Sequence, residues 1–468
     1  MNKTLQTDLL EIESLLEIVK KQGIEYLNKI DERKTSANVH KAELINLDSK
    51  GLGARNTLQL FNETFEPTIV SSSGPRFWGY VIGGSTPASI MGDWLATIYD
   101  QNPQAINGEG DISANIELET IQLILDLFNL PKSFVGGFVT GATMSNFTCL
   151  AVARQWFGKN YGKDFAKEGI TEKINILTAT PHSSALKSLA LLGIGSNNII
   201  KVNTIEGNRE AISIDDLESK IKTLNGQSFI LISSAGTVNT VDFDNFNAIK
   251  KLKKKYNFWW HTDAAFGGFA ACSDTYNYFV KDWEHSDSIT IDCHKWLNVP
   301  YESAVFLIKE EHSSLQVESF QNSNAPYLGN PMENFNYLNF LPENSRRLKA
   351  LPAWFSLRAY GKEGYKYIVE NAIDLAKYFG RKIKESENFK LVAPVRLNNI
   401  IFNINNTRNK ENIDSFLTQL SKTGKVFMTP TLYNDQKAIR VSFVNWRTTK
   451  NDIELVLKEM NRIINTIE

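Results

Sequence analysis

Short apolar runs alternate with amphipathic stretches from about residue 136 to residue 310. An apolar run followed by a helical pattern predicts a strand and then a helix, and repetition of this unit predicts a mostly parallel sheet covered on both faces. The expected strands are residues 137–139, 174–178, 199–202, 229–233, 258–262, 288–291 and 304–308. The expected helices between them are residues 144–157, 183–192, 214–224 and 243–256, with Ser213 as the cap of the third.

The two ends of the chain have other patterns. Leu9, Ile12 and Leu16 belong to a set of apolar residues at helical spacing, which predicts that residues 1–48 are helical. Near the C-terminus we expect long helices at 346–360 and 364–387, strands near 400–404 and 439–443, and a closing helix after Thr449. We therefore expect an N-terminal helical segment (1–89), a large α/β domain (90–350) and a smaller α+β domain (351–468).

Composition argues against several classes of partner. The chain has 468 residues, of which 42% are hydrophobic and 22% charged, and a net charge of −1. Without a basic half, we expect no binding to nucleic acid or to a membrane surface. Three cysteines are too few for a disulfide framework, and no apolar run approaches about 18 residues, so we expect a cytoplasmic protein in a reducing compartment.

Residues 136–146 (GGFVTGATMSN) form the first candidate site. An expected strand there enters a glycine-containing turn, and Thr143 then begins an expected helix. Free backbone N–H groups and the helix dipole at that terminus would bind a phosphate. The alternative is an ordinary turn with a threonine cap, because neither the dinucleotide-binding glycine motif nor a P-loop is present.

Asp263 ends an apolar expected strand and is followed by Ala264 and Ala265. A buried carboxylate in such a position can keep a pyridine nitrogen protonated, which makes the pyridine ring an electron sink. The two small residues would let a flat ring approach the backbone. The alternative is that Asp263 caps a helix that follows the strand.

Lys295 also ends an apolar strand, in the run DCHKW (residues 292–296). Burying a lysine without a partner costs free energy, so a buried lysine indicates a function. Schiff-base chemistry requires such a desolvated lysine. A lysine that points to solvent is the commoner alternative. His182 follows another strand and could stack on a planar ligand or transfer protons, or it could simply cap or pack a helix.

Two other chemistries find little support in the sequence. The run from His261 to Asp263 has no partner at zinc-ligand spacing, and the three cysteines (Cys149, Cys272 and Cys293) lie far apart, so we expect no metal site. A serine hydrolase of the α/β type would need a GxSxG turn, which is absent.

Taken in order, these features resemble the group II pyridoxal-phosphate-dependent amino-acid decarboxylases. That family includes the aromatic amino-acid, tyrosine, histidine, glutamate and cysteine-sulfinate decarboxylases. The similarity extends from about residue 50 to the C-terminus. Segments that resemble the family are 75–80 (PRFWGY), 114–119 (ANIELE), 298–301 (NVPY), 345–352 (SRRLKALP) and 440–446 (RVSFVNW).

The resemblance implies an aspartate-aminotransferase-like fold (fold type I) and a homodimer whose N-terminal segment wraps the partner. It implies decarboxylation of an L-amino acid to the amine, with Lys295 linked to pyridoxal 5'-phosphate until the substrate amine displaces it. Asp263 would pair with the pyridine nitrogen, and His182 would stack on the ring. The other cofactor contacts that it implies are Ala142, Thr143, Met144, Thr237, Ala265 and His294.

Two features separate this chain from the aromatic amino-acid decarboxylases. After Tyr80 those enzymes carry a Phe-Pro-Thr run, whereas residues 81–83 here are Val-Ile-Gly, which weakens the case for an aromatic substrate. The family also places a proton-donating tyrosine in a loop before an arginine-rich helix. We expect residues 320–342 to be that mobile cover, with Tyr337 as the donor, although a shifted alignment puts Phe340 there.

Alternatives to amine formation remain open at this point. Family members with phenylalanine at the loop position tend to couple decarboxylation to oxidative deamination and release an aldehyde. A non-catalytic protein with this fold is a further alternative, against which the presence of both Lys295 and Asp263 argues.

Overall fold

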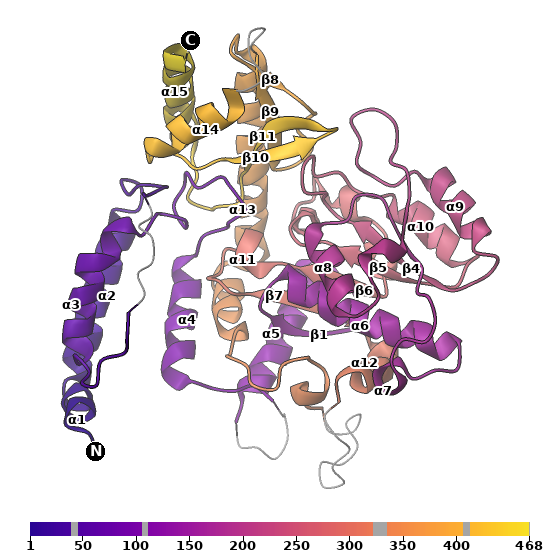
Figure 1. Ribbon diagram of the computed structural model, residues 1–468, viewed down its shortest axis with the longest axis horizontal. Helices are drawn as coiled ribbons and strands as arrows, with labels where there is room; N and C mark the ends of the chain where they lie inside the picture. Colours follow the sequence, from indigo (N-terminus) through magenta and orange to yellow (C-terminus); the bar gives the residue numbers. More distant parts are fainter. Residues whose placement is uncertain (39–44, 105–110, 322–334, 406–411, 468) are drawn as a thin grey trace.

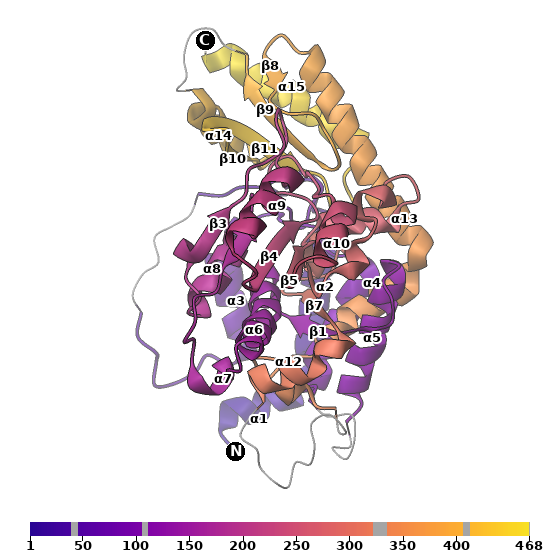
Figure 2. The same cartoon turned by 90° about the vertical axis from the view of Figure 1, so that its right-hand side faces the viewer.

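The computed structural model describes residues 1–38, 45–104, 111–321, 335–405 and 412–467. Within these ranges the long helix α13 (Ala350–Glu385) runs from a seven-stranded sheet to a four-stranded sheet (Figures 1 and 2). The expected break between two helices here is a non-helical residue inside α13, Gly361, whose φ of 56° suits glycine.

The seven-stranded sheet confirms the mostly parallel sheet that the alternating pattern predicts. Its order is β1-β7-β6-β5-β4-β2-β3, and the strands from β6 to β3 are parallel, whereas β7 is antiparallel to both of its neighbours. The strands are β1 (Phe134–Val139), β2 (Ile176–Thr178), β3 (Ile199–Lys201), β4 (Phe229–Ser234), β5 (Phe258–Asp263), β6 (Ser288–Ile291) and β7 (Ala304–Lys309).

Helices cover both faces of this sheet because its strands are apolar on both sides. Ile230 and Ile232 of β4 join one buried cluster with α6 and α8, and Leu231 joins a second cluster with α5, α9, α10 and α13. The helices are α4 (Pro87–Tyr99), α5 (Ser113–Leu127), α6 (Ala142–Asn160), α7 (Phe165–Glu168), α8 (Ser183–Leu191), α9 (Ile214–Thr223), α10 (Phe246–Lys253), α11 (Cys293–Trp296) and α12 (Ser313–Phe320).

The four-stranded sheet is antiparallel, in the order β10-β11-β9-β8. It consists of β8 (Phe389–Leu391), β9 (Asn399–Ile404), β10 (Thr429–Tyr433) and β11 (Gln436–Ser442), with α14 (Asn412–Lys422) and α15 (Lys450–Ile467). The sequence did not reveal β8 or β10. β8 is only three residues long, and β10 contains Pro430 and alternates in burial, so neither forms a continuous apolar run.

The N-terminal segment folds as α1 (Lys3–Leu10), α2 (Ile12–Asn28) and α3 (Ala54–Thr64), at the left of Figure 1. The expectation of helix over residues 1–48 is therefore wrong for residues 29–38 and 45–48, after the apolar spacing gives way to the charged run 29–34. None of these three helices contains a buried residue. In the described part of the chain, no helix has the length and apolar character to cross a membrane.

Candidate active site

A cavity of about 230 Å³ lies at the carboxyl ends of β4 and β5, where polar side chains follow the buried strands. Parallel strands present their carboxyl ends at one edge of the sheet, and such edges are common ligand sites. Five of the residues expected at a cofactor line this cavity: His182, Thr237, Asp263, Ala265 and Lys295.

Lys295 lies on α11, the single helical turn that follows β6. Its Nζ is 2.9 Å from Oδ2 of Asp292 and 5.6 Å from the ring centroid of Phe266. The other oxygen of Asp292 accepts the N–H of Ala142 at 2.8 Å. One buried carboxylate therefore ties the lysine to the first turn of α6, a contact that sequence reasoning missed although Asp292 lies within the lysine motif.

The residues expected at a phosphate lie beside the cavity rather than in its lining. Ala142, Thr143 and Met144 form the first turn of α6, where no carbonyl of the same helix can accept an N–H group. Asp292 accepts the first of these donors, so Thr143 and Met144 provide the remaining N–H groups of the turn. His294 Nε2 is 3.5 Å from Asp292 Oδ2, and burial lowers the pKa of His294.

Asp263 is buried at the end of β5 and accepts two hydrogen bonds. Its Oδ1 accepts the N–H of Ala265 at 3.2 Å, and its Oδ2 accepts the side-chain amide of Asn146 at 3.1 Å. Asn146 was part of the glycine-turn motif but was not expected to reach this carboxylate. The side chain of Asp263 is thus held in one position at the cavity wall.

His182 has the helix-capping role that was one of the alternatives for it, and its position is compatible with the other. It caps α8, because its Nδ1 accepts the N–H of Ser184 at 3.2 Å and lies 2.7 Å from the Ser184 hydroxyl. Its ring also lines the cavity. Burial lowers the pKa of His182, so the imidazole is neutral near pH 7.

Thr237 lines the cavity, but its hydroxyl is already committed. The Oγ1 donates to Glu210 Oε2 at 2.6 Å and accepts the N–H of Asp242 at 2.9 Å. The residue therefore contributes position and shape rather than a free hydroxyl.

The lining also includes Tyr80, Val81 and Arg440, which come from outside the seven-stranded sheet and which we call the opposite wall. Tyr80 and Val81 have φ angles of 58° and 61°, in the left-handed region that is strained for a β-branched residue such as valine. A Cβ on Gly83 would lie 1.5 Å from the carbonyl oxygen of Lys295. This close approach explains why Gly83 stands where the aromatic amino-acid decarboxylases carry threonine.

Arg440 reaches the cavity from β11 of the four-stranded sheet. Its Nη1 donates to the carbonyl of Val238 at 3.2 Å, and no carboxylate of the described residues lies within ion-pair distance of it. Burial lowers the pKa of Arg440, and Glu210 counteracts this shift. A half-buried cation without an ion pair among the described residues is suited to an anionic ligand. The sequence marked this segment only as resembling the family.

Tyr337 does not line this cavity, so its expected role as proton donor stays a prediction. Its side chain is fully buried, its hydroxyl donates to the carbonyl of Gly136 at 3.2 Å, and Arg346 lies over its ring. Phe340, the alternative position, is buried as well. Of the expected cover 320–342, residues 322–334 lie outside the described residues.

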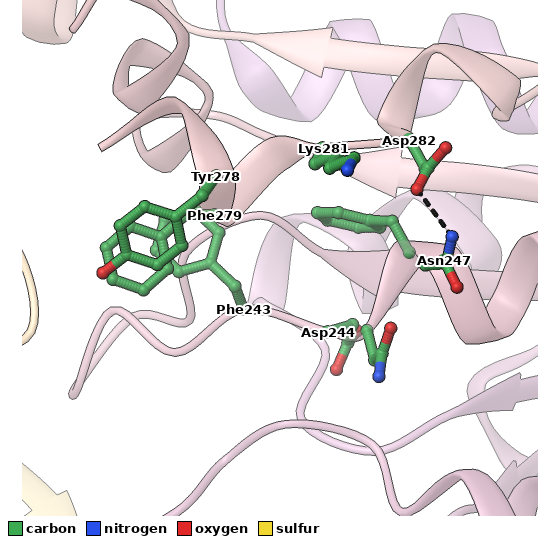
Figure 3. Close-up of a pocket in the computed structure, with 9 residues that line it drawn as sticks. Phe243, Asp244, Asn247, Tyr278, Phe279, Lys281 and Asp282 are labelled. Carbon is green, nitrogen blue, oxygen red and sulfur yellow. Dashed lines mark hydrogen bonds between the residues drawn. The ribbon is translucent and has the colours of Figure 1, made fainter. Parts of the chain in front are cut away.

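A second hollow, shown in Figure 3, lies at the N-terminal end of α10 and brings together none of the expected residues. Phe243 stacks on Phe279 with ring centroids 4.6 Å apart. Asn247 and Lys250 both bind the carboxylate of Asp282, at 2.9 Å each. Because that charge is already neutralised, the hollow is a weaker candidate than the cavity at Lys295.

The donor set of the first cavity fits pyridoxal phosphate. It combines a lysine, a buried carboxylate, a neutral imidazole and a small residue, Ala265, that leaves room for a flat ring. The first turn of α6 lies beside the lysine and supplies N–H groups for a phosphate.

Comparisons with known proteins point the same way. The family model for the pyridoxal-dependent decarboxylase conserved domain matches residues 46–405. An aromatic-L-amino-acid decarboxylase of Bacillus atrophaeus is 25% identical over 461 residues, which cover 94% of this chain and 92% of that protein. A phenylacetaldehyde synthase of Arabidopsis thaliana is 25% identical over 80% of this chain and 78% of that protein. The solved structure of Catharanthus roseus tryptophan decarboxylase in complex with L-tryptophan matches the fold with a TM-score of 0.88, at 18% identity over 98% of both chains.

Proposed function

This chain belongs to the pyridoxal-dependent decarboxylase family, and from that premise we propose that it releases the α-carboxyl group of an L-amino acid as carbon dioxide and yields the corresponding amine. It is a carboxy-lyase with pyridoxal phosphate as its cofactor. The observation that carries the proposal is the meeting of Lys295, Asp263 and His182 on one cavity, with Arg440 opposite.

The lining residues at the carboxyl ends of the sheet strands, which we call the sheet wall, each have a proposed role: Lys295, Asp263, His182 and Ala265. Lys295 carries the amine that bonds to the cofactor and gives way to the substrate amine. Asp263 holds a proton on the pyridine nitrogen, and His182 packs against one face of the ring while Ala265 leaves space on the other. When bound, pyridoxal phosphate accepts the electron pair that remains on the α-carbon after carbon dioxide leaves.

Arg440 is proposed to hold a carboxylate of the substrate. Its side chain is half-buried and lacks an ion pair among the described residues, so an incoming carboxylate would gain a charged hydrogen-bond partner that is partly shielded from water. The lysine and the guanidinium thus lie on the same cavity, as orientation of an amino acid requires.

Aldehyde formation is the second candidate function, and the position of Tyr337 supports it. A carbanion at the α-carbon that receives no proton can react with molecular oxygen, and the products are then aldehyde, ammonia and hydrogen peroxide beside carbon dioxide. Tyr337 is buried against Gly136 and does not line this cavity, which supports aldehyde formation as a second candidate.

We also propose that the protein is a homodimer in the cytoplasm, with residues 1–89 against the partner subunit. Apolar residues of α4 recur on one helical face and remain largely exposed: Met91 (59%), Trp94 (48%) and Ile98 (59%). A face of this kind marks a protein interface. Met91→Glu with Ile98→Glu should shift sedimentation from dimer to monomer, and an unchanged dimer would contradict this interface. The free cysteines suit a reducing compartment.

The test of the proposed function measures every product at once. Purified enzyme with pyridoxal phosphate is incubated with each L-amino acid, and carbon dioxide, amine, aldehyde and ammonia are determined together under air and under nitrogen. We expect carbon dioxide and amine in equal amounts from one substrate class. Aldehyde that depends on air would favour the second candidate, and no carbon dioxide from any amino acid would overturn both.

A further inference from the structure

A chain of hydrogen bonds runs beneath the cavity from Trp259 to Asn146. The indole N–H of Trp259 donates to Ser288 Oγ at 2.9 Å, and the same hydroxyl lies 2.9 Å from Nδ1 of His261. The other ring nitrogen of His261 lies 2.8 Å from Oδ1 of Asn146. All four side chains are fully buried, so water does not compete for these bonds.

At Asn146 the chain divides toward both proposed cofactor contacts of the sheet wall. The Nδ2 of Asn146 donates to Asp263 Oδ2 at 3.1 Å and to Ser184 Oγ at 3.0 Å. The Ser184 hydroxyl in turn lies 2.7 Å from Nδ1 of His182. One side-chain amide therefore connects the carboxylate and the imidazole.

The chemistry of the two ends fixes the direction of every bond between them. The indole of Trp259 can only donate, and the ionised carboxylate of Asp263 can only accept. Asn146 therefore turns its Nδ2 to Asp263 and its Oδ1 to His261, so the proton of the neutral His261 ring lies on Nε2 and Ser288 donates to Nδ1. Ser184 donates to Nδ1 of His182, because that nitrogen also accepts the N–H of Ser184 and so carries no proton. The proton of the neutral His182 ring therefore lies on Nε2, outside this network.

Burial keeps His261 in this state. It lowers the pKa of His261 to about 4, so the ring is neutral at physiological pH. A neutral ring has one donor and one acceptor nitrogen, and Ser288 occupies the acceptor. Without the donor on Nε2, the amide of Asn146 could turn over and present its oxygen to the carboxylate of Asp263, which is repulsive.

We propose that Asn146 and His261 are positioning residues that hold Asp263 and His182 in one relative orientation through this one-directional chain. The inference rests on the proposed function, in which Asp263 maintains the protonated pyridine nitrogen and His182 packs on the ring. Neither positioning residue touches the cavity, so each acts through a residue that does.

The test follows the cofactor's nitrogen rather than turnover. Holoenzyme is reconstituted with pyridoxal phosphate labelled with ¹⁵N in the ring, and the ¹⁵N shift is titrated with pH. We expect Asn146→Leu and His261→Leu to lower the pH at which the nitrogen loses its proton by about one unit, because a carboxylate that is no longer held in position pairs less well with that nitrogen. His261→Gln should restore most of the shift, because its amide can still donate to Asn146.

Gln155→Leu is the matched control on the same helix. Gln155 is buried and, like Asn146, donates twice and accepts once, but its partners are Asp164, Glu318 and Ala166, away from the cavity. It should leave the titration unchanged. Ser288→Ala removes only the hydroxyl that orients His261 and should give a smaller shift in the same direction, which keeps the test decisive if the leucine variants do not fold.

Asp263→Asn separates the two proposals. If this variant leaves the titration unchanged, the proposed role of Asp263 fails. The other outcome is that Asp263→Asn shifts the titration while Asn146→Leu, His261→Leu and Ser288→Ala leave it unchanged, as the control Gln155→Leu does. The hydrogen bonds beneath the cavity would then serve packing alone, which overturns the inference and leaves the proposed function intact.

Discussion

The two walls of the cavity are built differently. On the sheet wall, Asp263 and His182 are held by hydrogen bonds from buried partners, and Lys295 is paired with Asp292. On the opposite wall, Val81 is in a strained left-handed conformation and Arg440 has no ion pair among the described residues. A wall with satisfied polar groups can hold a rigid cofactor, whereas a wall with an unpaired charge is suited to select the substrate.

The largest effect should come from the lysine of the sheet wall. Lys295→Ala should lose covalent attachment of the cofactor and with it nearly all activity, because among the described residues no other amine lines the cavity. Borohydride reduction followed by peptide mapping should label Lys295 alone in the wild type. Lys309→Ala, at the end of β7 and outside the cavity, is the control and should keep the label. A reduced cofactor on another lysine would contradict the site itself.

The second prediction tests whether the opposite wall binds the substrate while the sheet wall binds the cofactor. Arg440→Leu should lower kcat/KM by about tenfold to a hundredfold, the loss of one hydrogen bond to a charged group, while cofactor content is unchanged. Arg440→Lys should recover part of the loss because it keeps the charge. Steady-state kinetics and the cofactor absorbance measure the two quantities separately. Loss of cofactor in proportion to activity would place Arg440 with the cofactor and break the comparison.

The sheet wall was largely predictable from sequence, and the opposite wall was not. Asp263 and Lys295 each end an apolar run, so local pattern alone identifies them as polar groups at the edge of a sheet. Arg440 belongs to a strand of the four-stranded sheet, and its lack of an ion pair among the described residues depends on how that sheet packs. Asp292 was likewise hidden, because its partner Ala142 is 150 residues away in the sequence.

Tyr337 shows a different limit of the sequence. Its spacing to the arginine-rich helix matched the family, but spacing does not report which way a side chain points. The segment that follows residue 334 turns inward, so the tyrosine packs under Arg346 in the core.

The third prediction concerns His261, the buried histidine beneath the sheet wall. Burial lowers the pKa of His261 from 6.5 to about 4 in the folded protein. Between these values the unfolded chain binds a proton that the folded chain does not, so this contribution to stability is complete above pH 6.5 and is lost as the pH falls toward 4. At pH 5 the loss is about 2 kcal/mol.

Urea unfolding of the wild type and of His261→Gln at pH 7 and pH 5 measures this contribution. The stability difference between the two proteins should shrink by that amount at pH 5. The comparison with the variant is needed because Asp244 acts in the opposite direction: burial raises its pKa to about 7, so stability from Asp244 falls as the pH rises from 4 to 7. A difference that is independent of pH would mean that His261 is not held neutral.

The smallest effect should come from Tyr337, which lies behind the sheet wall and not on either face of the cavity. Tyr337→Phe removes a buried hydrogen bond to Gly136 and should lower the free energy of unfolding by about 1 kcal/mol, with the product unchanged. Tyr327, the other tyrosine of segment 320–342, lies outside the described residues and provides the matched substitution. If the donated proton comes from this segment, Tyr327→Phe should release carbon dioxide with aldehyde and ammonia in place of amine under air. If only Tyr337→Phe switched the product to aldehyde, Tyr337 would be the proton donor. The core at Gly136 would then have to open during the reaction.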